Sequence, residues 1–239
     1  MQVIPAIDVK DDRCVRLYQG DYDRATVFSG RPAEVARRWE RDGARLLHVV
    51  DLDGALHGTP RNLKAIREIV RAVSIPVEAS GGLRSVDAVQ SLFDVGVARV
   101  VIGTAAVEDP GLLDDLAERW PGKFAVGIDA RDGKVTTEGW RRQTEVRAVG
   151  LAKDVVLRGA DGVIYTDVER DGTLTEPNYT ATAEIVAAVP VPVIAAGGVA
   201  RLEHLGRLQA VGVAGAIVGR ALYTGAVNLA DAISLAEGA

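Results

Sequence analysis

The chain has 239 residues, of which 48% are hydrophobic and 26% charged, with a formal net charge of −5. This balance is typical of a globular protein, and a negative net charge without a basic stripe argues against nucleic-acid binding. No apolar run approaches the ~20 residues of a membrane span, and the N-terminus lacks the apolar segment of a signal peptide. We therefore expect a cytoplasmic protein without a nucleic-acid or membrane partner.

Short, nearly continuous apolar runs recur along the chain, as expected for parallel strands that are covered on both faces. Strands are expected at 2–8, 45–51, 75–80, 98–103, 124–129, 161–167, 191–196 and 213–219. Amphipathic helices are expected between and after them, at 32–42, 62–72, 85–95, 110–120, 146–158, 179–189, 202–211 and 228–237. This α/β alternation favours a (βα)₈ TIM barrel over a doubly wound open sheet, which seldom holds eight uninterrupted units.

Two longer stretches show neither the apolar runs of strands nor the amphipathic pattern of helices. Residues 18–31 follow the first strand and residues 130–147 follow the fifth, and both are expected to be irregular loops. In a barrel they lie at the C-terminal rim, where loops tend to carry function. No linker or charge block divides the chain, and we expect one domain, residues 1–239.

Motifs of the first half return in the second half in the same order. PAID ends the first strand at Asp8, and VGID ends the fifth at Asp129, 121 positions later. The glycine pairs of EASGGLRS and IAAGGVAR are 116 positions apart, and so are the glycines of VVIGTAAV and AIVGRALY. We therefore expect two similar half-barrels, of about residues 1–120 and 121–239, related by a pseudo-two-fold axis.

Glycines at the ends of the seventh and eighth strands predict a phosphate site, because the loops after these strands commonly bind phosphate in barrels. Glycine lets the backbone N–H groups approach the anion, although a single pair would be explained equally well by a tight turn. The candidates are Gly197, Gly198, Gly219 and Arg220, and the half-repeat adds an equivalent site at Gly81, Gly82, Arg84, Gly103 and Thr104. Two sites predict a small ligand with a phosphate at each end.

Aspartates lie between these two predicted sites. Asp8 and Asp129 end opposite strands, and we expect them to face each other across the barrel mouth. Two carboxylates in different environments can supply a general base and a general acid, whereas a single strand-end aspartate more often caps a helix. The loop after the sixth strand adds Asp167 and Asp171 as acidic candidates, next to Thr166.

The remaining polar candidates have structural explanations. We expect Asp51 to be structural and paired with a rim arginine, and His48 to pack in the core. His57 and His204 are expected to be exposed, and the lone Cys14 to be a buried, inert thiol. Metal or cofactor chemistry is not expected, because His, Asp and Glu show no ligand spacing.

The whole chain resembles one enzyme family, the phosphoribosylformimino-5-aminoimidazole carboxamide ribotide (ProFAR) isomerases of histidine biosynthesis. The motifs that carry the resemblance are PAIDVKDDRCVRLYQGDYDRATVFSGRP, HVVDLDGA, SGGLRS, IGTAAVEDP, GIDARDGKVTTEGW, TDVERDGTL, IAAGGV and VGRALY. The resemblance implies an Amadori rearrangement without a cofactor or metal, in which the bisphosphorylated aminoaldose ProFAR becomes the aminoketose PRFAR.

The resemblance also implies roles for single residues. Asp8 matches the family's proton acceptor, and Asp129 matches the proton donor that assists opening of the ribose ring. Asp171 matches a residue also implicated in acid–base work, and Thr166 matches one that supports the reacting ribose.

The resemblance implies roles for two further residues. Arg16 matches a rim arginine near the reacting centre. Trp140 falls on the fifth loop, where its ring is positioned to stack on the imidazole of the substrate.

Relatives of the family define the alternatives. The cyclase of the same pathway typically begins with CLDV and a lysine-bearing segment, where this chain has AIDV and VRLYQG. A bifunctional branch also isomerises phosphoribosylanthranilate in tryptophan synthesis and typically carries an arginine where this chain has Glu138. We predict a mainly single-substrate, monomeric enzyme, although Arg141 or Arg142 could replace the missing charge. A phosphoribosyl-ligand-binding barrel without turnover is the non-enzymatic alternative.

Overall fold

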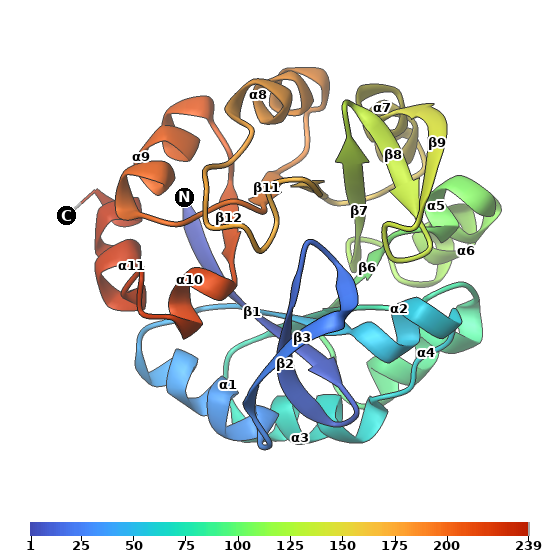
Figure 1. Ribbon diagram of the computed structural model, residues 1–239. Helices are drawn as coiled ribbons and strands as arrows, with labels where there is room; N and C mark the ends of the chain where they lie inside the picture. Colours follow the sequence, from blue (N-terminus) through green and yellow to red (C-terminus); the bar gives the residue numbers. More distant parts are fainter. Residues whose placement is uncertain (239) are drawn as a thin grey trace.

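The structure of the protein is a computed structural model, and the residues described are 1–238. Parallel strands form a closed barrel at its centre (Figure 1). These strands are β1 (Gln2–Lys10), β4 (Leu47–Asp51), β5 (Val77–Ser80), β6 (Arg99–Ile102), β7 (Phe124–Arg131), β10 (Val163–Asp167), β11 (Val193–Ala196) and β12 (Gly215–Val218). Each pairs with its neighbour in this order, β12 pairs with β1, and β10 pairs with β7, which closes the ring. The predicted (βα)₈ barrel is confirmed, and the open-sheet alternative is excluded.

Helices surround the barrel and bury their apolar faces against it (Figure 1). The longer helices are α1 (Pro32–Arg41), α3 (Leu63–Ala72), α4 (Val86–Asp94), α6 (Gly111–Arg119), α7 (Ala148–Leu157), α8 (Tyr179–Ala188), α9 (Leu202–Val211) and α11 (Leu229–Glu237). Short helices follow three strands: α2 (Leu52–His57), α5 (Ala105–Glu108) and α10 (Arg220–Tyr223). In the described range 1–238, every helix is too short or too polar to cross a membrane.

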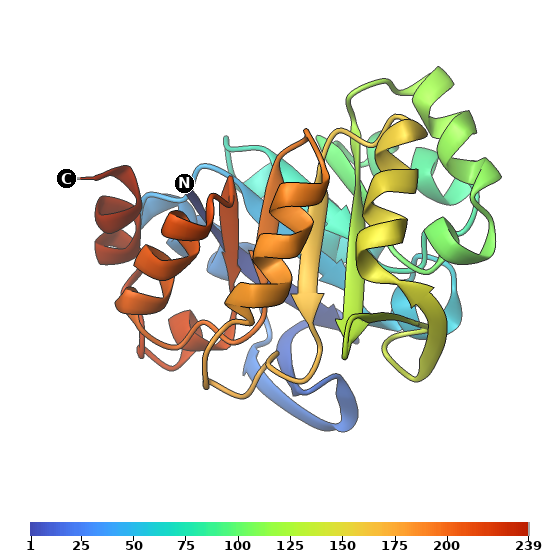
Figure 2. The same ribbon diagram turned by 90° about the horizontal axis from the view of Figure 1, so that it is seen from above.

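The two stretches predicted to be irregular loops are β-hairpins, and that prediction was wrong. The first hairpin consists of β2 (Arg13–Tyr18) and β3 (Asp21–Ser29), and the second of β8 (Lys134–Thr137) and β9 (Arg142–Arg147). Strands β3 and β9 are exposed along most of their length, and they therefore lack the apolar alternation that marks a strand in a sequence. Figure 2 shows both hairpins at the same end of the barrel as the loop that follows β10.

The barrel lumen contains a compact group of aliphatic side chains, separate from the larger core between barrel and helices: Ile4, Ala6, Val101, Ala125, Ile164, Ile194 and Ile217. An eight-stranded barrel is just wide enough for such side chains to fill it. Open space is therefore displaced to the carboxyl ends of the strands, beneath the two hairpins.

Equivalent hydrogen bonds occur in the two halves of the chain. The Asn62 side chain donates to Asp51 at 2.7 Å, and the Asn178 side chain donates to Asp167 at 2.7 Å. Both members of the second pair lie 116 positions after those of the first. The spacing found in the glycine motifs therefore extends to a structural pair that holds each loop to its strand.

Two expectations about polar residues were wrong. Asp51 is structural, but its partners are the backbone N–H groups of Gly54, Arg61 and Asn62 and the Asn62 side chain rather than a rim arginine side chain. His204 is not exposed: it is buried in α9, and its Nδ1 accepts a hydrogen bond from the Ala200 N–H. The expected burial of Cys14 is confirmed.

Two glycines of α9 should respond oppositely to alanine. Gly206 lies in the helix interior with open space around an added Cβ, whereas Gly212 ends the helix at φ +95°. Gly206→Ala should raise the free energy of unfolding by about 0.5–1 kcal/mol, because alanine has the higher helix propensity. Gly212→Ala should lower it by about 1 kcal/mol, because a Cβ disfavours the left-handed conformation. Urea denaturation measures both, and a stability loss in Gly206→Ala would contradict the assignment.

Candidate active site

A cavity of about 220 Å³ opens at the carboxyl ends of the barrel strands. It gathers most of the site residues predicted from the sequence: Asp8, Arg16, Gly81, Gly82, Arg84, Gly103, Thr104, Asp129, Trp140, Thr166 and Asp171. A smaller adjoining cavity contains Gly197, Gly198, Gly219 and Arg220 and shares Arg16 and Asp171 with the first. The acidic candidate Asp167 lines neither cavity, because its carboxylate accepts hydrogen bonds from the Asn178 side chain and the Glu169 N–H. The structure therefore brings the other predicted residues into one continuous mouth.

Asp8 is held by an arginine from the first hairpin. The Arg16 guanidinium donates to the Asp8 carboxylate at 2.6 Å and to the Ala6 carbonyl at 2.7 Å. The hairpin strand β2 pairs with β1, and this register carries Arg16 over the end of the barrel. Both side chains are largely buried, where an ion pair is much stronger than in water. Asp8 therefore faces the cavity with a guanidinium as its partner.

Asp129 faces the same cavity from β7, in a different environment. Burial raises the pKa of its carboxyl group, and hydrogen bonds from Thr166 and Trp140 offset part of that effect. Thr166 lies on the neighbouring strand in direct register with Asp129. The two strand-end aspartates therefore differ: Asp8 has a cation as its partner, and Asp129 has neutral donors.

Asp171 joins them from the loop after β10. Burial raises its pKa to about 6, against the opposing charge of Arg16, and the carboxylates of Asp8 and Asp129 add to the rise. A carboxyl group with this pKa exchanges its proton close to neutral pH, as a general acid or base must. Three acidic side chains thus surround one small space.

The first glycine cluster lies on one side of the mouth. Gly81 and Gly82 follow β5 with φ values of +106° and +75°. An added Cβ on Gly81 would overlap the Asp51 carbonyl, and one on Gly82 would overlap Gly54. These glycines therefore have a packing role, and both also line the cavity.

The second glycine cluster lies across the mouth and repeats this geometry. Gly197 and Gly198 follow β11 with φ values of +87° and +81°, and a Cβ on Gly198 would overlap the backbone of Glu176. Arg220 donates to the Gly172 carbonyl at 2.6 Å, which ties the β10 loop to this cluster. The two clusters therefore flank the aspartates from opposite halves of the chain.

The second hairpin covers part of the mouth with Trp140. This residue lies in the turn between β8 and β9, at φ +69°, and its ring packs against Gly20 in the turn of the first hairpin. An added Cβ on Gly20 would overlap the ring. The tips of the two hairpins therefore meet above the cavity.

His48 departs from the expectation of a packed core residue. It is buried, but it lines the cavity, and its ring contacts the carboxylate of Glu78 on the next strand. Glu78 was not among the predicted site residues. The sequence does not identify the members of this pair, because thirty positions separate them and the register of β4 with β5 makes them neighbours.

Comparisons with known proteins agree over nearly the whole chain. The family described as histidine biosynthesis protein matches residues 2–228. Relatives from Picosynechococcus sp., Gloeothece citriformis and Microcystis aeruginosa are 54%, 56% and 52% identical to it. Each match covers 98% of this chain, and 92%, 92% and 94% of the respective relative. All three are named 1-(5-phosphoribosyl)-5-((5-phosphoribosylamino)methylideneamino)imidazole-4-carboxamide isomerase.

The raised pKa of Asp171 predicts a pH-dependent gain in stability on its neutralisation. The folded-state pKa of about 6 exceeds the ordinary value of 3.8, and the wild-type protein therefore loses stability as pH rises from about 4 through 6. Asp171→Asn should raise the free energy of unfolding by on the order of 2–3 kcal/mol at pH 7.5 and leave it nearly unchanged at pH 4.

Denaturant titrations of both proteins at the two pH values measure this effect. Asp8→Asn is the matched control with the opposite sign, because it leaves the buried Arg16 guanidinium without its carboxylate. Equal stability of Asp171→Asn and the wild type at pH 7.5 would contradict the assignment.

Proposed function

The chain belongs to the histidine biosynthesis protein family, and we propose that it isomerises ProFAR to PRFAR with aspartates as its acid and base. Its relatives carry the name of that isomerase, and over half of its residues are identical to theirs along nearly the full length. It is an aldose–ketose isomerase of histidine biosynthesis. The observation that supports the catalytic proposal is the convergence of Asp8, Asp129 and Asp171 in one cavity flanked by two equivalent glycine clusters.

The two glycine clusters suit a substrate with a phosphate at each end. We assign one phosphate to the loops that carry Gly81, Gly82, Gly103 and Thr104, with Arg84 at the rim. The other phosphate is assigned to Gly197, Gly198, Gly219 and Arg220. Glycine-lined turns let backbone N–H groups contact phosphate oxygens, and each cluster adds one arginine charge. The reacting ribose then lies between the clusters, over the aspartates.

Proton transfer follows from the different environments of the acids. A proton from Asp129 is transferred to the ring oxygen of the ribose as its bond to C1 breaks, which leaves a Schiff base at C1. Asp8 then removes the proton from C2, and the electron pair forms the C1–C2 double bond of an enaminol. The C2 hydroxyl loses its proton as C1 gains one, which yields the ketone without net gain or loss of atoms.

Asp171 and Thr166 support these steps. Asp171 has a pKa of about 6 and supplies a second exchangeable proton at the same cavity. Thr166 holds the Asp129 carboxyl group by a hydrogen bond and reaches the reacting ribose from the cavity wall. Trp140 covers the mouth, where its ring is placed to stack on the imidazole of the substrate.

The domain organisation, the oligomeric state and the location of the protein are also proposals. We propose one domain over residues 1–239, made of half-barrels of about 1–120 and 121–239, that acts as a monomer in the cytoplasm. The exposed large apolar side chains support a monomer, because they are scattered over β3, β9, α7 and α11: Val27, Phe28, Val146, Leu157 and Leu235.

Asp8→Asn tests the catalytic assignment. The variant should bind ProFAR with a Kd within about tenfold of the wild type, because the glycine clusters are intact. Its kcat should fall by roughly 10²–10⁴-fold, the usual contribution of a general base. Steady-state assays and calorimetry separate the two quantities, and Asp154→Asn on the exposed face of α7 is the control. Near-normal turnover in Asp8→Asn would refute the assignment, and a wild type that binds without turnover would favour the non-enzymatic barrel.

Charges around Glu138 support a single substrate. The Glu138 N–H donates to the Thr104 hydroxyl at 3.0 Å, and its carboxylate lies 3.7 Å from Arg142. Glu108 lies 3.6 Å from the same Arg142 and 3.8 Å from Arg84. Both arginines are therefore balanced by glutamates. Neither of these two arginines is therefore available to the carboxylate of phosphoribosylanthranilate without a competing glutamate.

Glu138→Arg should change this specificity. We expect kcat/KM for phosphoribosylanthranilate to rise by about tenfold or more, which corresponds to about 1.4 kcal/mol, because the substitution adds a cation and removes one of the two glutamates near Arg142. Glu138→Gln, which removes the negative charge alone, should give a smaller rise. Assays of the wild type and both variants with each aminoaldose measure it. Comparable wild-type efficiency on both substrates would overturn the single-substrate proposal.

A further inference from the structure

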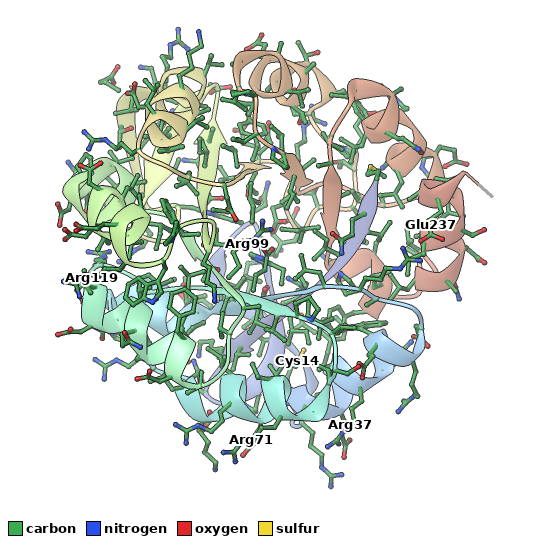
Figure 3. All side chains as sticks on the ribbon, turned by 180° about the vertical axis from the view of Figure 1, so that it is seen from behind. Cys14, Arg37, Arg71, Arg99, Arg119 and Glu237 are labelled. Atoms are coloured by element: carbon green, nitrogen blue, oxygen red, sulfur yellow. The ribbon has the colours of Figure 1, made fainter. Side chains whose placement is uncertain are left out.

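A charged group lies in the lumen just below the catalytic aspartates. Three consecutive strands place His48, Glu78 and Arg99 directly opposite one another in register. Glu78 has no exposed surface, and its carboxylate accepts from Arg99 Nε at 2.9 Å and Arg99 Nη2 at 2.6 Å, both to Oε2. Its Oε1 contacts His48 Nδ1 at 2.8 Å. Figure 3, a view from the amino end of the barrel, shows Arg99 near the barrel axis.

His48 and Arg99 both contact the buried carboxylate of Glu78. Burial by itself would raise the pKa of Glu78, but the hydrogen bond from His48 and the charges of His48 and Arg99 outweigh it and lower the pKa. Glu78 is therefore a carboxylate and can only accept hydrogen bonds. Because the Arg99 guanidinium already pairs with Oε2, the additional contact of Oε1 with His48 calls for an explanation of its own.

The explanation lies in the orientation of the imidazole. A carboxylate at Nδ1 requires that this nitrogen carry a proton, and in the neutral ring Nε2 is then an acceptor. His48 lines the cavity that holds Asp8 and Asp129, whereas Glu78 does not. The ring thus connects a fixed acceptor in the lumen to the space where the reacting ribose is proposed to lie.

We propose that Glu78 is a positioning residue for the isomerisation: it fixes the orientation and the Nδ1–H tautomer of His48, whose Nε2 accepts a hydrogen bond from a hydroxyl of the reacting ribose. This inference rests on the proposed function for its substrate, but the tautomer is a property of the protein alone. Arg99 has a part in the arrangement, because its donors hold Oε2 and leave Oε1 for the histidine.

Glu78→Gln should invert the tautomer without changing the shape of the side chain. Arg99 has only donors and will take the amide oxygen, which turns the amide NH₂ toward His48 Nδ1. That nitrogen must then accept, and the proton moves to Nε2. Long-range ¹H–¹⁵N spectra of ¹⁵N-histidine-labelled protein at pH 8, without substrate, distinguish the two tautomers.

The chain supplies its own reference for this measurement. It has three histidines. His204 Nδ1 accepts from a backbone N–H, which makes it an Nε2–H tautomer in the wild type and in the variant. His57 is exposed. We expect Nδ1–H for His48 in the wild type and Nε2–H in Glu78→Gln. An Nε2–H tautomer of His48 in the wild type would overturn the proposal.

Turnover gives the second readout. In Glu78→Gln, kcat for ProFAR should fall roughly tenfold to hundredfold, the usual effect of losing an outer-shell partner of a site histidine, while KM stays within about threefold. His48→Asn keeps a donor for Glu78 but lacks the nitrogen that faces the cavity, and it should lose as much kcat while remaining folded. His48→Asn therefore tests whether the His48 nitrogen contributes to turnover, even if Glu78→Gln fails to fold.

Asp161→Asn is the matched control. Asp161 lies 3.9 Å from Arg99 at the far end of the same charged group and does not line the cavity. Its substitution should leave both the His48 tautomer and kcat unchanged. Full kcat in Glu78→Gln or in His48→Asn would refute a positioning role. Absence of ProFAR turnover in the wild type would refute the proposed function instead, and the spectra would still decide the tautomer.

Discussion

The pairing of β7 with β10 closes the sheet, and the site depends on that closure. Five residues of each strand are in register, from Val126 opposite Val163 to Ala130 opposite Asp167. A closed sheet of parallel strands directs every carboxyl end to one rim, and it limits the lumen to the width of a few side chains. Aspartates at the ends of distant strands are thereby brought together without any contact in the sequence. The aliphatic layer beneath them leaves space only at that rim.

The mouth contains more carboxyl groups than cationic side chains that donate hydrogen bonds to them. Asp8, Asp129 and Asp171 line one cavity, and Arg16 is the guanidinium that donates to Asp8. Like charges in a desolvated space do not all ionise together, and their pKa values separate. Burial raises the pKa of Asp129, and it raises that of Asp171 to about 6, with a further contribution from the carboxylates of Asp8 and Asp129.

The sequence was sufficient to predict the barrel and the positions of residues at the strand ends. Apolar runs of strand length report burial, and a strand end fixes where Asp8 and Asp129 must lie. The hairpin strand β3 was missed, because exposed positions carry no periodic signal. His204 was misassigned because the N–H that its ring accepts from belongs to a loop residue, and loop geometry is not encoded in periodicity.

Side-chain partners on neighbouring strands are harder to predict from the sequence. Glu78 meets His48 only through the register of β4 with β5, and a shift of two residues would pair different side chains on the same face. A carboxylate within an apolar run such as 75–80 is nevertheless informative, because an isolated buried charge is costly and must have a partner. The sequence therefore indicates that this buried carboxylate has a partner, and the fold identifies that partner.

The two halves share a framework but differ in charge. Lys10 pairs with Arg13 where β1 turns back into β2, and 121 positions later Arg131 pairs with Lys134 where β7 turns back into β8. By the same spacing, Thr137 is the counterpart of Arg16. A cation therefore reaches the aspartate of the first half, and the aspartate of the second half has only neutral donors. The repeat gives the mouth two similar glycine clusters, and this single difference gives the two aspartates unlike partners. A symmetric scaffold can bind a symmetric pair of phosphates, but directional proton transfer requires that the symmetry be broken between them.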